Sequence, residues 1–177
     1  MDVFNLTVKQ ISEKIKDAQL TSVDLCKTYI ERIKKFEKDI HAWAHFDEKI
    51  LLEKAEEADN HRRSGKTLGL LHGIPVALKD IIGTLDMPTE CGTVFRKGMS
   101  ASQDAEIVDL LKNEGAIIMG KTATSELAYY SPSKTKNPHD DARTPGGSSS
   151  GSAAVVASFM APLSIGSQTG GSVIRPA

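Results

Sequence analysis

The sequence predicts an α/β protein with a largely parallel sheet that is preceded by helices. Two observations support this class. Residues 1–64 carry apolar positions at helical spacing. From Gly65 onward, short apolar runs bounded by glycine, proline or charged residues alternate with helical patterns, which is typical of parallel strands joined by helices. A length of 177 residues fits one domain. We therefore predict a single domain with a helical start over 1–64 and an α/β part over 65–177.

The helical start is expected to contain three helices. The second begins near Leu20-Thr21-Ser22, which offers a capping hydroxyl, and its apolar residues recur at helical spacing over 23–33. The third extends over about 48–63 and is rich in Glu, Lys, Ala and Leu, so its charges are interpreted as a solvated face. Trp43 and Phe46 are expected to pack in the core.

The α/β part begins with a buried strand over 74–78, which ends at Lys79 and Asp80. The later elements are expected in this order: a helix over 104–113, a strand over 116–119, a helix near 122–128, a helix over 152–159 and a strand over 163–166. The segment 131–144 is the one stretch with the character of a linker between domains.

Composition and charge exclude several classes of function. A net charge of −1 provides no basic surface for nucleic acid or for an anionic membrane. The N-terminus lacks the features of a signal peptide, and the longest weakly polar run, 153–166, is too short to span a bilayer. Cys26 and Cys91 make neither a disulfide framework nor a metal site, and the five histidines are scattered. We expect a cytoplasmic protein without metal, nucleic-acid partner or membrane association.

Residues 115–122 match the phosphate-loop pattern G-x-x-x-x-G-K-[ST]. In a working phosphate loop, the middle residues form a bend whose backbone N–H groups surround phosphate. Here the middle residues are Ala-Ile-Ile-Met, the best strand candidate of the region. A strand cannot also form that bend, so we interpret the match as accidental.

Lys79 has two interpretations. A lysine at a strand end beside an aspartate, here Asp80, is most often half of a surface ion pair. The functional alternative places the amine in a buried position at the carboxyl edge of the sheet, where open α/β sheets bind ligands. Burial disfavours the ammonium, so such a lysine can lose its proton near neutral pH and act as a base. Lys79 alone does not decide between them.

Two Gly-Gly-Ser stretches, 146–148 and 170–172, are candidates for turns that present a hydroxyl. A flexible linker would have patternless polar flanks, whereas an apolar helical run follows Ser148 and a strand-like run precedes Ser172. Residues 169–171 can direct successive backbone N–H groups at one point, as an oxyanion requires. Because no histidine lies near either serine in the sequence, the pattern favours a serine activated by lysine.

Three ordered segments resemble the amidase signature family: LHGIPVALKD over 71–80, RTPGGSS over 143–149 and GSQTGGS over 166–172. The similarity extends from about Thr7 to the last residue. It implies an α/β/α sandwich with a mixed, largely parallel sheet. It also implies hydrolysis of a small-molecule amide to an acid and ammonia or an amine, through a Ser-cisSer-Lys triad and without a cofactor.

The resemblance implies a role for several residues. Lys79 matches the base of the family, and Ser172 matches its nucleophile. Ser148 matches the bridging serine, whose peptide bond from Gly147 is cis in the family. The oxyanion hole is matched by three consecutive residues: Thr169, Gly170 and Gly171.

Some positions depart from the family pattern. The A subunits of amidotransferases usually read G-S-D-T-G-G-S-I-R-Q-P and G-K-T-N, whereas this chain has Gln168 for the aspartate and Ala123 for the asparagine. The departures are more similar to malonamidase-type and other free-standing amidases. In the malonamidase, the arginine that matches Arg175 binds a substrate carboxylate, so Arg175 is a candidate anion anchor, with a structural role as the alternative. Ser150 stands where the family prefers glycine, which would add strain if the position needs a positive φ.

Chains of this family are more than twice as long as 177 residues. The sequence is therefore interpreted as an N-terminal portion of an amidase domain, incomplete at its C-terminal side and too short to be active alone. Two alternatives stay open beside the free-standing amidase. One is the glutamine-hydrolysing A subunit of a tRNA-dependent amidotransferase, and the other is an inactive truncated product. Whether the full-length form is a homodimer is also left open.

Overall fold

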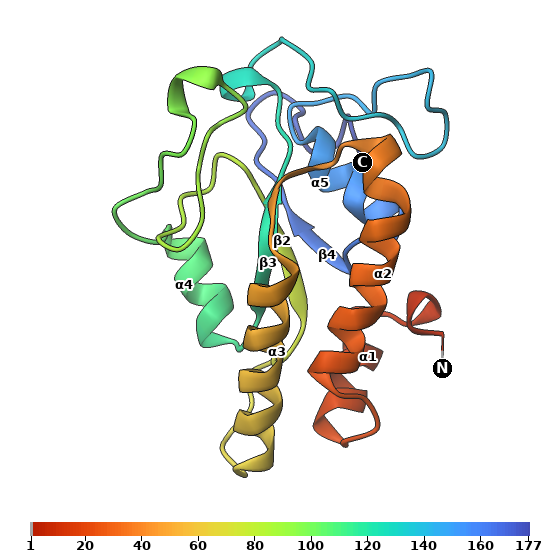
Figure 1. Cartoon of the computed structure of the whole chain (residues 1–177), viewed down its shortest axis with the longest axis vertical. Helices are drawn as coiled ribbons and strands as arrows, with labels where there is room; N and C mark the ends of the chain where they lie inside the picture. The colour runs from red at the N-terminus through yellow and green to blue at the C-terminus, as the bar shows by residue number, and fades with distance from the viewer. Residues whose placement is uncertain (1) are drawn as a thin grey trace.

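The computed structural model describes residues 2–177, and Figure 1 shows their arrangement. The α-helices within this range are α1 (Val8–Lys16), α2 (Ser22–Ile40), α3 (Glu48–Arg63), α4 (Glu106–Asn113) and α5 (Ser150–Ala157). The strands are β1 (Trp43–Phe46), β2 (Pro75–Lys79), β3 (Ile117–Thr122) and β4 (Leu163–Ile165). Three short 3-10 helices are η1 (Val3–Asn5), η2 (Val94–Arg96) and η3 (Glu126–Ala128).

The four strands form one sheet in the order β1-β3-β2-β4. Strands β2, β3 and β4 are parallel, and β1 pairs antiparallel with β3. The sheet is therefore mixed and largely parallel, as predicted. Because the carboxyl ends of parallel strands meet at one edge, the residues that follow β2, β3 and β4 gather among the loops at the top of Figure 1.

One extra residue lies in β3. The register pairs Val76 with Ile118 but pairs the next residue, Ala77, with Gly120, which leaves Met119 without a partner in β2. This is the arrangement of a β-bulge. It changes which side chains of β3 point to which face of the sheet.

Helices cover both faces of the sheet. On one face, Ala77 and Ile117 pack in a cluster with buried residues of α1, α2, α3 and α5. On the other face, Val76 and Ile118 pack with Val108 and other residues of α4. Figure 1 shows α4 on one side of the sheet and α1, α2 and α3 on the other. The α/β/α sandwich predicted from the sequence is therefore confirmed.

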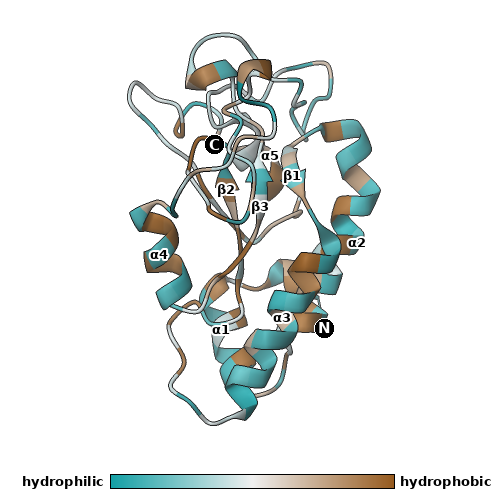
Figure 2. Cartoon of the chain, turned by 60° about the vertical axis from the view of Figure 1, so that its left-hand side comes forward, coloured by the Kyte–Doolittle hydropathy of each residue, from teal (hydrophilic) through white to brown (hydrophobic). Residues whose placement is uncertain are grey.

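The start of α2 is held by two kinds of cap. The Thr21 hydroxyl accepts a hydrogen bond from the Asp24 N–H at 3.0 Å, as predicted from the sequence. The carboxylate of Asp59 in α3 accepts from the N–H groups of Ser22 and Val23 at 2.8 and 3.1 Å. A buried carboxylate thus ties α3 to α2. The rest of α3 is mainly hydrophilic (Figure 2), in agreement with a solvated outer face.

The segment between α2 and α3 differs from the prediction, because β1 interrupts the helical start. Trp43 pairs with Thr122 and Phe46 with Gly120, so β3 supplies the hydrogen bonds that make this short segment a strand. Both aromatic residues pack against the core, as expected, with ring centroids 5.4 Å apart.

The helix predicted near 122–128 is wrong. Thr122 is the last residue of β3, and the three residues of η3 are the only helical turn in this stretch of the described chain. Leu127 and Ala128 have φ values of 50° and 57°, which no right-handed helix allows. The N–H of Ser125 donates to the Ser148 carbonyl at 3.1 Å. A tertiary hydrogen bond thus replaces the helical one.

The segment 131–144 is a loop packed on the domain and not a linker. The N–H of Lys136 donates to the Ile40 carbonyl at 2.9 Å, and the Thr135 hydroxyl donates to the His41 carbonyl at 2.8 Å. The hydroxyls of Ser133 and Ser150 are 2.9 Å apart. These contacts join the segment to the end of α2 and to the start of α5.

Helix α5 begins two residues earlier than predicted and packs directly on the backbone of its neighbours. A Cβ atom at Gly151 would overlap the Ala42 carbonyl and the Ala123 amide, so only glycine fits there. Ser150 is the first residue of α5 and has helical backbone angles. The strain considered for Ser150 is therefore absent, since this position does not need a positive φ.

Candidate active site

Two buried lysines lie at the carboxyl edge of the sheet, on opposite faces. Lys79 at the end of β2 pairs with Thr122, and Leu78 pairs with Lys121. Paired residues of neighbouring strands share a face. Lys79 therefore points to the α5 face, as Ala77 does, and Lys121 points to the α4 face. Neither lysine has exposed surface.

Lys79 donates to two hydroxyls. Its Nζ lies 2.7 Å from Ser148 Oγ and 2.9 Å from Ser167 Oγ. Among residues 2–177, its ammonium has no carboxylate partner, because Asp80 pairs with Lys121 instead. The interpretation of Lys79 as half of a surface ion pair is therefore wrong. Burial lowers the pKa of the Lys79 ammonium to about 8.

The peptide bond between Gly147 and Ser148 is cis, as the family resemblance implies. The carbonyl of Ser148 accepts from the Ser125 N–H and from the Thr124 hydroxyl, both at 3.1 Å. Gly147 lies so close to Ser125 that a Cβ atom would be 2.8 Å from its Oγ. The loop after β3 thus fixes the backbone on which the Ser148 hydroxyl is mounted.

The loop with Ser172 lies beside the start of α5. The N–H of Ser149 donates to the Ser172 carbonyl at 3.1 Å. Gln168 precedes Ser172 in the chain, and its side-chain oxygen accepts from the N–H groups of Val173 and Ile174, which follow Ser172, at 3.0 and 2.9 Å. These bonds close a turn around Ser172. The half-buried Ser172 hydroxyl has no hydrogen-bond partner within residues 2–177. The structure therefore joins Lys79 to Ser148 but does not join Ser148 to Ser172.

The three candidate oxyanion residues precede Ser172 in this turn. Thr169 and Gly170 are exposed, and Gly171 has a φ of 124°, which glycine adopts without strain. In the part of the chain that the structure describes, no acceptor takes the backbone N–H groups of these three residues. Three neighbouring N–H groups are thus available to an external acceptor.

Arg175 lines a cavity that Lys79 does not line. It lines this cavity, of about 530 Å³, together with Asn137 and His139 from the 131–144 loop, Ser164 from β4 and residues of α5. Its side chain is exposed, and its backbone N–H donates to the Gly171 carbonyl at 2.9 Å. The guanidinium has no acidic partner among residues 2–177. A negatively charged group can therefore reach it.

Reasoning from sequence alone missed two residues of this edge. Ser167 is absent from the predicted site, although it follows β4 by two residues and lies within the third motif. Lys121 enters the prediction only within the accidental phosphate-loop pattern. The prediction that this pattern covers a strand is confirmed, since β3 takes up residues 117–122 of it and all six residues of β3 are buried. A polar residue just past a parallel strand is the signal that would have found Ser167.

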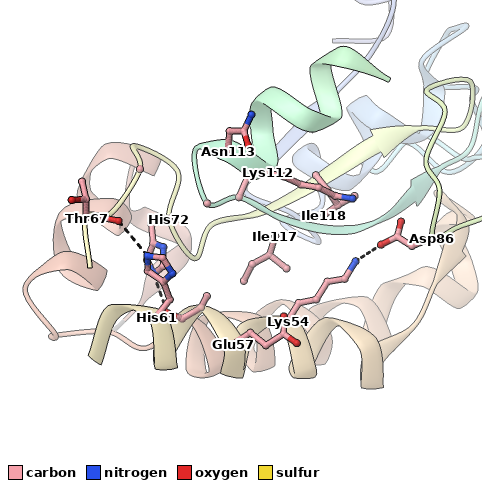
Figure 3. Close-up of a pocket in the computed structure, with 14 residues that line it drawn as sticks. Lys54, Glu57, His61, Thr67, His72, Asp86, Lys112, Asn113, Ile117 and Ile118 are labelled. Carbon is pink, nitrogen blue, oxygen red and sulfur yellow. Dashed lines mark hydrogen bonds and ion pairs between the residues drawn. The ribbon is translucent and has the colours of Figure 1, made fainter. Parts of the chain in front are cut away.

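A second cavity, of about 410 Å³, lies at the opposite end of the strands, between α3, α4 and the start of β3 (Figure 3). Its lysines are already paired: Lys54 lies 2.6 Å from Asp86, and Lys112 is bonded to Asp104. His61 and His72 contact each other, with ring centroids 5.3 Å apart. None of the predicted site residues lines this cavity.

Residues 2–177 contain neither a candidate metal cluster nor a candidate membrane helix. No group of three or more His, Cys, Asp or Glu side chains in this range is arranged to hold a metal ion. None of the helices described is long and apolar enough to cross a membrane.

Comparison with known proteins identifies relatives that match most or all of this chain. The model of the Amidase family matches residues 24–177. The A subunit numbered 2 of the glutamyl-tRNA(Gln) amidotransferase of Clostridium acetobutylicum is 42% identical over 183 residues, which cover 100% of this chain and 38% of that protein. The chain thus spans well under half the length of this curated relative.

Solved structures agree with the fold. The peptide amidase from Stenotrophomonas maltophilia superposes with a TM-score of 0.93 and 33% identity, over 99% of this chain and 38% of the other. A fatty acid amide hydrolase superposes with a TM-score of 0.91 and 29% identity, over 99% of this chain and 32% of the other.

Proposed function

The chain belongs to the amidase family, and on that basis we propose that the protein hydrolyses a carboxylic amide to an acid and ammonia or an amine. The observation that carries the proposal is the contact between Lys79 Nζ and Ser148 Oγ, 2.7 Å apart and buried at the carboxyl edge of the sheet. A structural lysine would be paired with a carboxylate, whereas this one contacts only hydroxyls. A pKa of about 8 leaves part of the amine neutral near physiological pH.

The proposed relay begins with neutral Lys79. Its amine accepts the Ser148 hydroxyl proton, while Ser148 Oγ takes the proton of Ser172. Ser172 Oγ then forms a bond to the amide carbon, and the carbonyl electron pair moves onto oxygen. Ser148 and Ser172 must approach by hydroxyl rotation or by a small shift of the 168–174 turn when substrate binds.

The second half of the reaction uses the same groups. Thr169, Gly170 and Gly171 supply the N–H groups that stabilise the negative oxygen. When the carbon–nitrogen bond breaks, the proton held by Lys79 passes back through Ser148 to the leaving nitrogen. Water then attacks the acyl-enzyme on Ser172, loses its proton to the same relay and releases the acid.

A pair of single substitutions tests the proposal in the protein expressed from its complete open reading frame. Ser172→Ala is expected to abolish amide hydrolysis and covalent labelling by a fluorophosphonate, because the attacking oxygen is lost. Lys79→Met is expected to fold and to lose most activity, because the base is lost. Labelling that persists at another serine in the alanine variant would assign the nucleophile elsewhere.

We propose a free-standing amidase of the malonamidase type as the subgroup, acting in the cytoplasm on a small-molecule amide, with no nucleic-acid or membrane partner. Gln168 supports it, because the A subunits of amidotransferases usually have aspartate at this position. Arg175, which has no acidic partner among residues 2–177, suits a substrate that carries a carboxylate.

The glutamine-hydrolysing A subunit is the second candidate, and the 42% identity with the Clostridium acetobutylicum protein favours it. An inactive product that keeps the three residues is the third. Assaying the purified protein alone with small primary amides separates them. Turnover without added partner proteins supports the free-standing enzyme. Glutamine hydrolysis that needs co-purifying partners supports the second candidate, and the absence of turnover with and without them supports the third.

A further inference from the structure

The second buried lysine, Lys121, has no part in the proposed relay. Its ammonium donates to the Ile82 carbonyl at 2.7 Å and to the Thr89 hydroxyl at 2.8 Å, and it lies 3.8 Å from Asp80 Oδ1. Burial lowers the pKa of the Lys121 ammonium, while the charges of Asp80 and, more weakly, Cys91 oppose that change. Lys121 is thus a buried cation with three partners on the turn and loop that follow β2.

Burying the ammonium of Lys121 at this position carries a free-energy cost. Removing an ammonium from water costs several kcal/mol, and a buried ion pair often stabilises a fold no more than apolar side chains of the same volume. The face of the sheet on which it lies is otherwise apolar, with Val76, Leu78 and Ile118 in the cluster below it. Stability alone therefore does not account for a lysine at this position.

Asp80 and Ile82, two of the partners of Lys121, belong to the turn that begins at Lys79. The carbonyl of Lys79 accepts from the N–H groups of Ile81 and Ile82 at 2.8 and 2.9 Å. The carbonyl of that same Ile82 is the one that Lys121 binds. Asp80, which lies between Lys79 and Ile82 in the turn, donates its backbone N–H to the Thr122 carbonyl at 3.0 Å. The turn is thus fixed at both ends by β3.

A second set of bonds leads from Asp80 to Ser148. The Asp80 carboxylate accepts from the N–H groups of Glu90 and Gly92, and its carbonyl accepts from Cys91. The Cys91 carbonyl accepts from Leu127 at 2.8 Å, in the loop whose Ser125 N–H binds the Ser148 carbonyl. Through these hydrogen bonds, the buried pair of Lys121 and Asp80 supports the backbone of Lys79 and the backbone of Ser148. The side chains of these two residues form the 2.7 Å contact.

We propose that Lys121, paired with Asp80, is a positioning residue that fixes the Lys79 amine against the Ser148 hydroxyl from the opposite face of the sheet. This inference rests on the proposed function, because it assigns Lys121 a role in the same relay. Proton transfer requires its groups within a fraction of an ångström of the productive geometry. A looser turn therefore slows the chemical step without weakening substrate binding.

The test uses Lys121→Met in the protein expressed from its complete open reading frame. We expect kcat with a primary amide and the rate of fluorophosphonate labelling to fall by about ten- to a hundredfold. The KM should change by less than about threefold, since ground-state binding is unaltered. Lys54→Met is the matched control: it removes a lysine from an ion pair with Asp86 at the other end of the strands and should keep the parental kcat.

Thr89→Val provides a milder variant in case Lys121→Met does not fold. It removes one acceptor of Lys121 and keeps the shape of the side chain, and it should lower kcat by about three- to tenfold with little change in KM. Folded Lys121→Met or Thr89→Val protein with the parental kcat, beside an inactive Lys79→Met protein, would overturn the positioning role alone. Full activity of Lys79→Met would instead overturn the proposed function on which it rests.

Discussion

Lys79 loses the water that would stabilise its charge, because its side chain has no exposed surface. Its two partners are hydroxyls, Ser148 and Ser167, which stabilise an ammonium less than a carboxylate does. The pKa therefore falls from its ordinary value of 10.5 to about 8. Two measurable consequences follow, one for activity and one for stability.

The first consequence is the pH dependence of catalysis. If neutral Lys79 is the base, kcat/KM should rise with pH, reach half of its maximum near pH 8 and then level off. A profile of amide hydrolysis between about pH 5.5 and 10 measures this midpoint. A rise centred near the ordinary histidine pKa of about 6.5 would point to a different base.

The second consequence is a stability gain on removing Lys79. Because its folded-state pKa of about 8 lies below 10.5, the unfolded chain binds the proton more tightly. The folded protein carries the full penalty below pH 8, about 3 kcal/mol, and loses it as the pH rises toward 10.5. Lys79→Met removes this penalty but also two hydrogen bonds worth about 1 kcal/mol each.

We therefore expect Lys79→Met to raise the free energy of unfolding by about 1 kcal/mol at pH 7, and this gain to become a loss of about 1 to 2 kcal/mol above about pH 10, where only the lost hydrogen bonds remain. Urea unfolding at the two pH values measures the difference. Equal effects at both pH values would mean that the buried ammonium costs the fold nothing.

At the scale of elements, the position of α5 depends on one glycine. The backbone of Gly151 touches Ala42 and Ala123, at the edge shared by β1 and β3. We expect Gly151→Ala to lower the free energy of unfolding by about 3 kcal/mol, because a methyl group has no room there. Ala153→Gly, a substitution on the same helix at a half-buried residue, should cost only about 1 kcal/mol. Similar losses in denaturant unfolding for the two variants would contradict this packing.

The N-terminal helices depend on a different contact, the Arg32 guanidinium. It lies 4.1 Å from the centre of the Phe36 ring and 5.5 and 5.6 Å from those of Phe4 and Phe159, and its Nε donates to the Ser158 carbonyl at 2.8 Å. Arg32→Met keeps an apolar stem and removes the cation. We expect a loss of about 2 kcal/mol in the free energy of unfolding, measured by urea denaturation. A loss below about 0.5 kcal/mol would show that the stem alone packs these rings.

Sequence reasoning succeeds where the signal is local. The apolar run before Lys79 and the capping hydroxyl of Thr21 are properties of a few adjacent residues, and both elements lie where predicted. It fails where the structure of a segment depends on a distant partner. The strand β1 exists because β3 lies beside it, and residues 122–128 avoid a helix because Ser125 binds the Ser148 carbonyl. Hydrogen bonds over such separations leave no pattern in either segment.

The candidate site divides in the same way. Lys79, Ser148 and Ser172 are predicted from motifs, and the structure brings the first two into contact. The contacts of Ser167 and Lys121 depend on sheet register, which a motif does not encode. The extra residue in β3 decides the face on which Lys121 lies, and Gly120 is the one local sign of a bulge in the Ile-Ile-Met-Gly run.

At the scale of the whole molecule, the edge of the sheet at β4 is open. Within residues 2–177, β4 pairs only with β2, and its three residues are half-buried. A strand with unpaired N–H and C=O groups and apolar neighbours tends to pair with a second chain. We expect a protein of residues 1–177 alone to self-associate as its concentration rises, which light scattering after size-exclusion chromatography would detect. A monomer at all concentrations up to about 100 μM would show that this edge is protected.

Met119 is the extra residue of β3, because it has no partner in β2. Along an uninterrupted strand, odd and even residues alternate between the two faces, so one extra residue within the ladder would invert every side chain downstream. If Met119 took a place in a regular ladder opposite Ala77, Lys121 would lie opposite Lys79, and two cations would be crowded against one pair of serines. Because Met119 bulges out of the ladder, Lys121 lies opposite Leu78 on the face away from Lys79, and a deletion of Met119 alone should leave it there. The separation of the two lysines thus depends on the bulge that takes up the extra residue, and not on the number of residues in the strand.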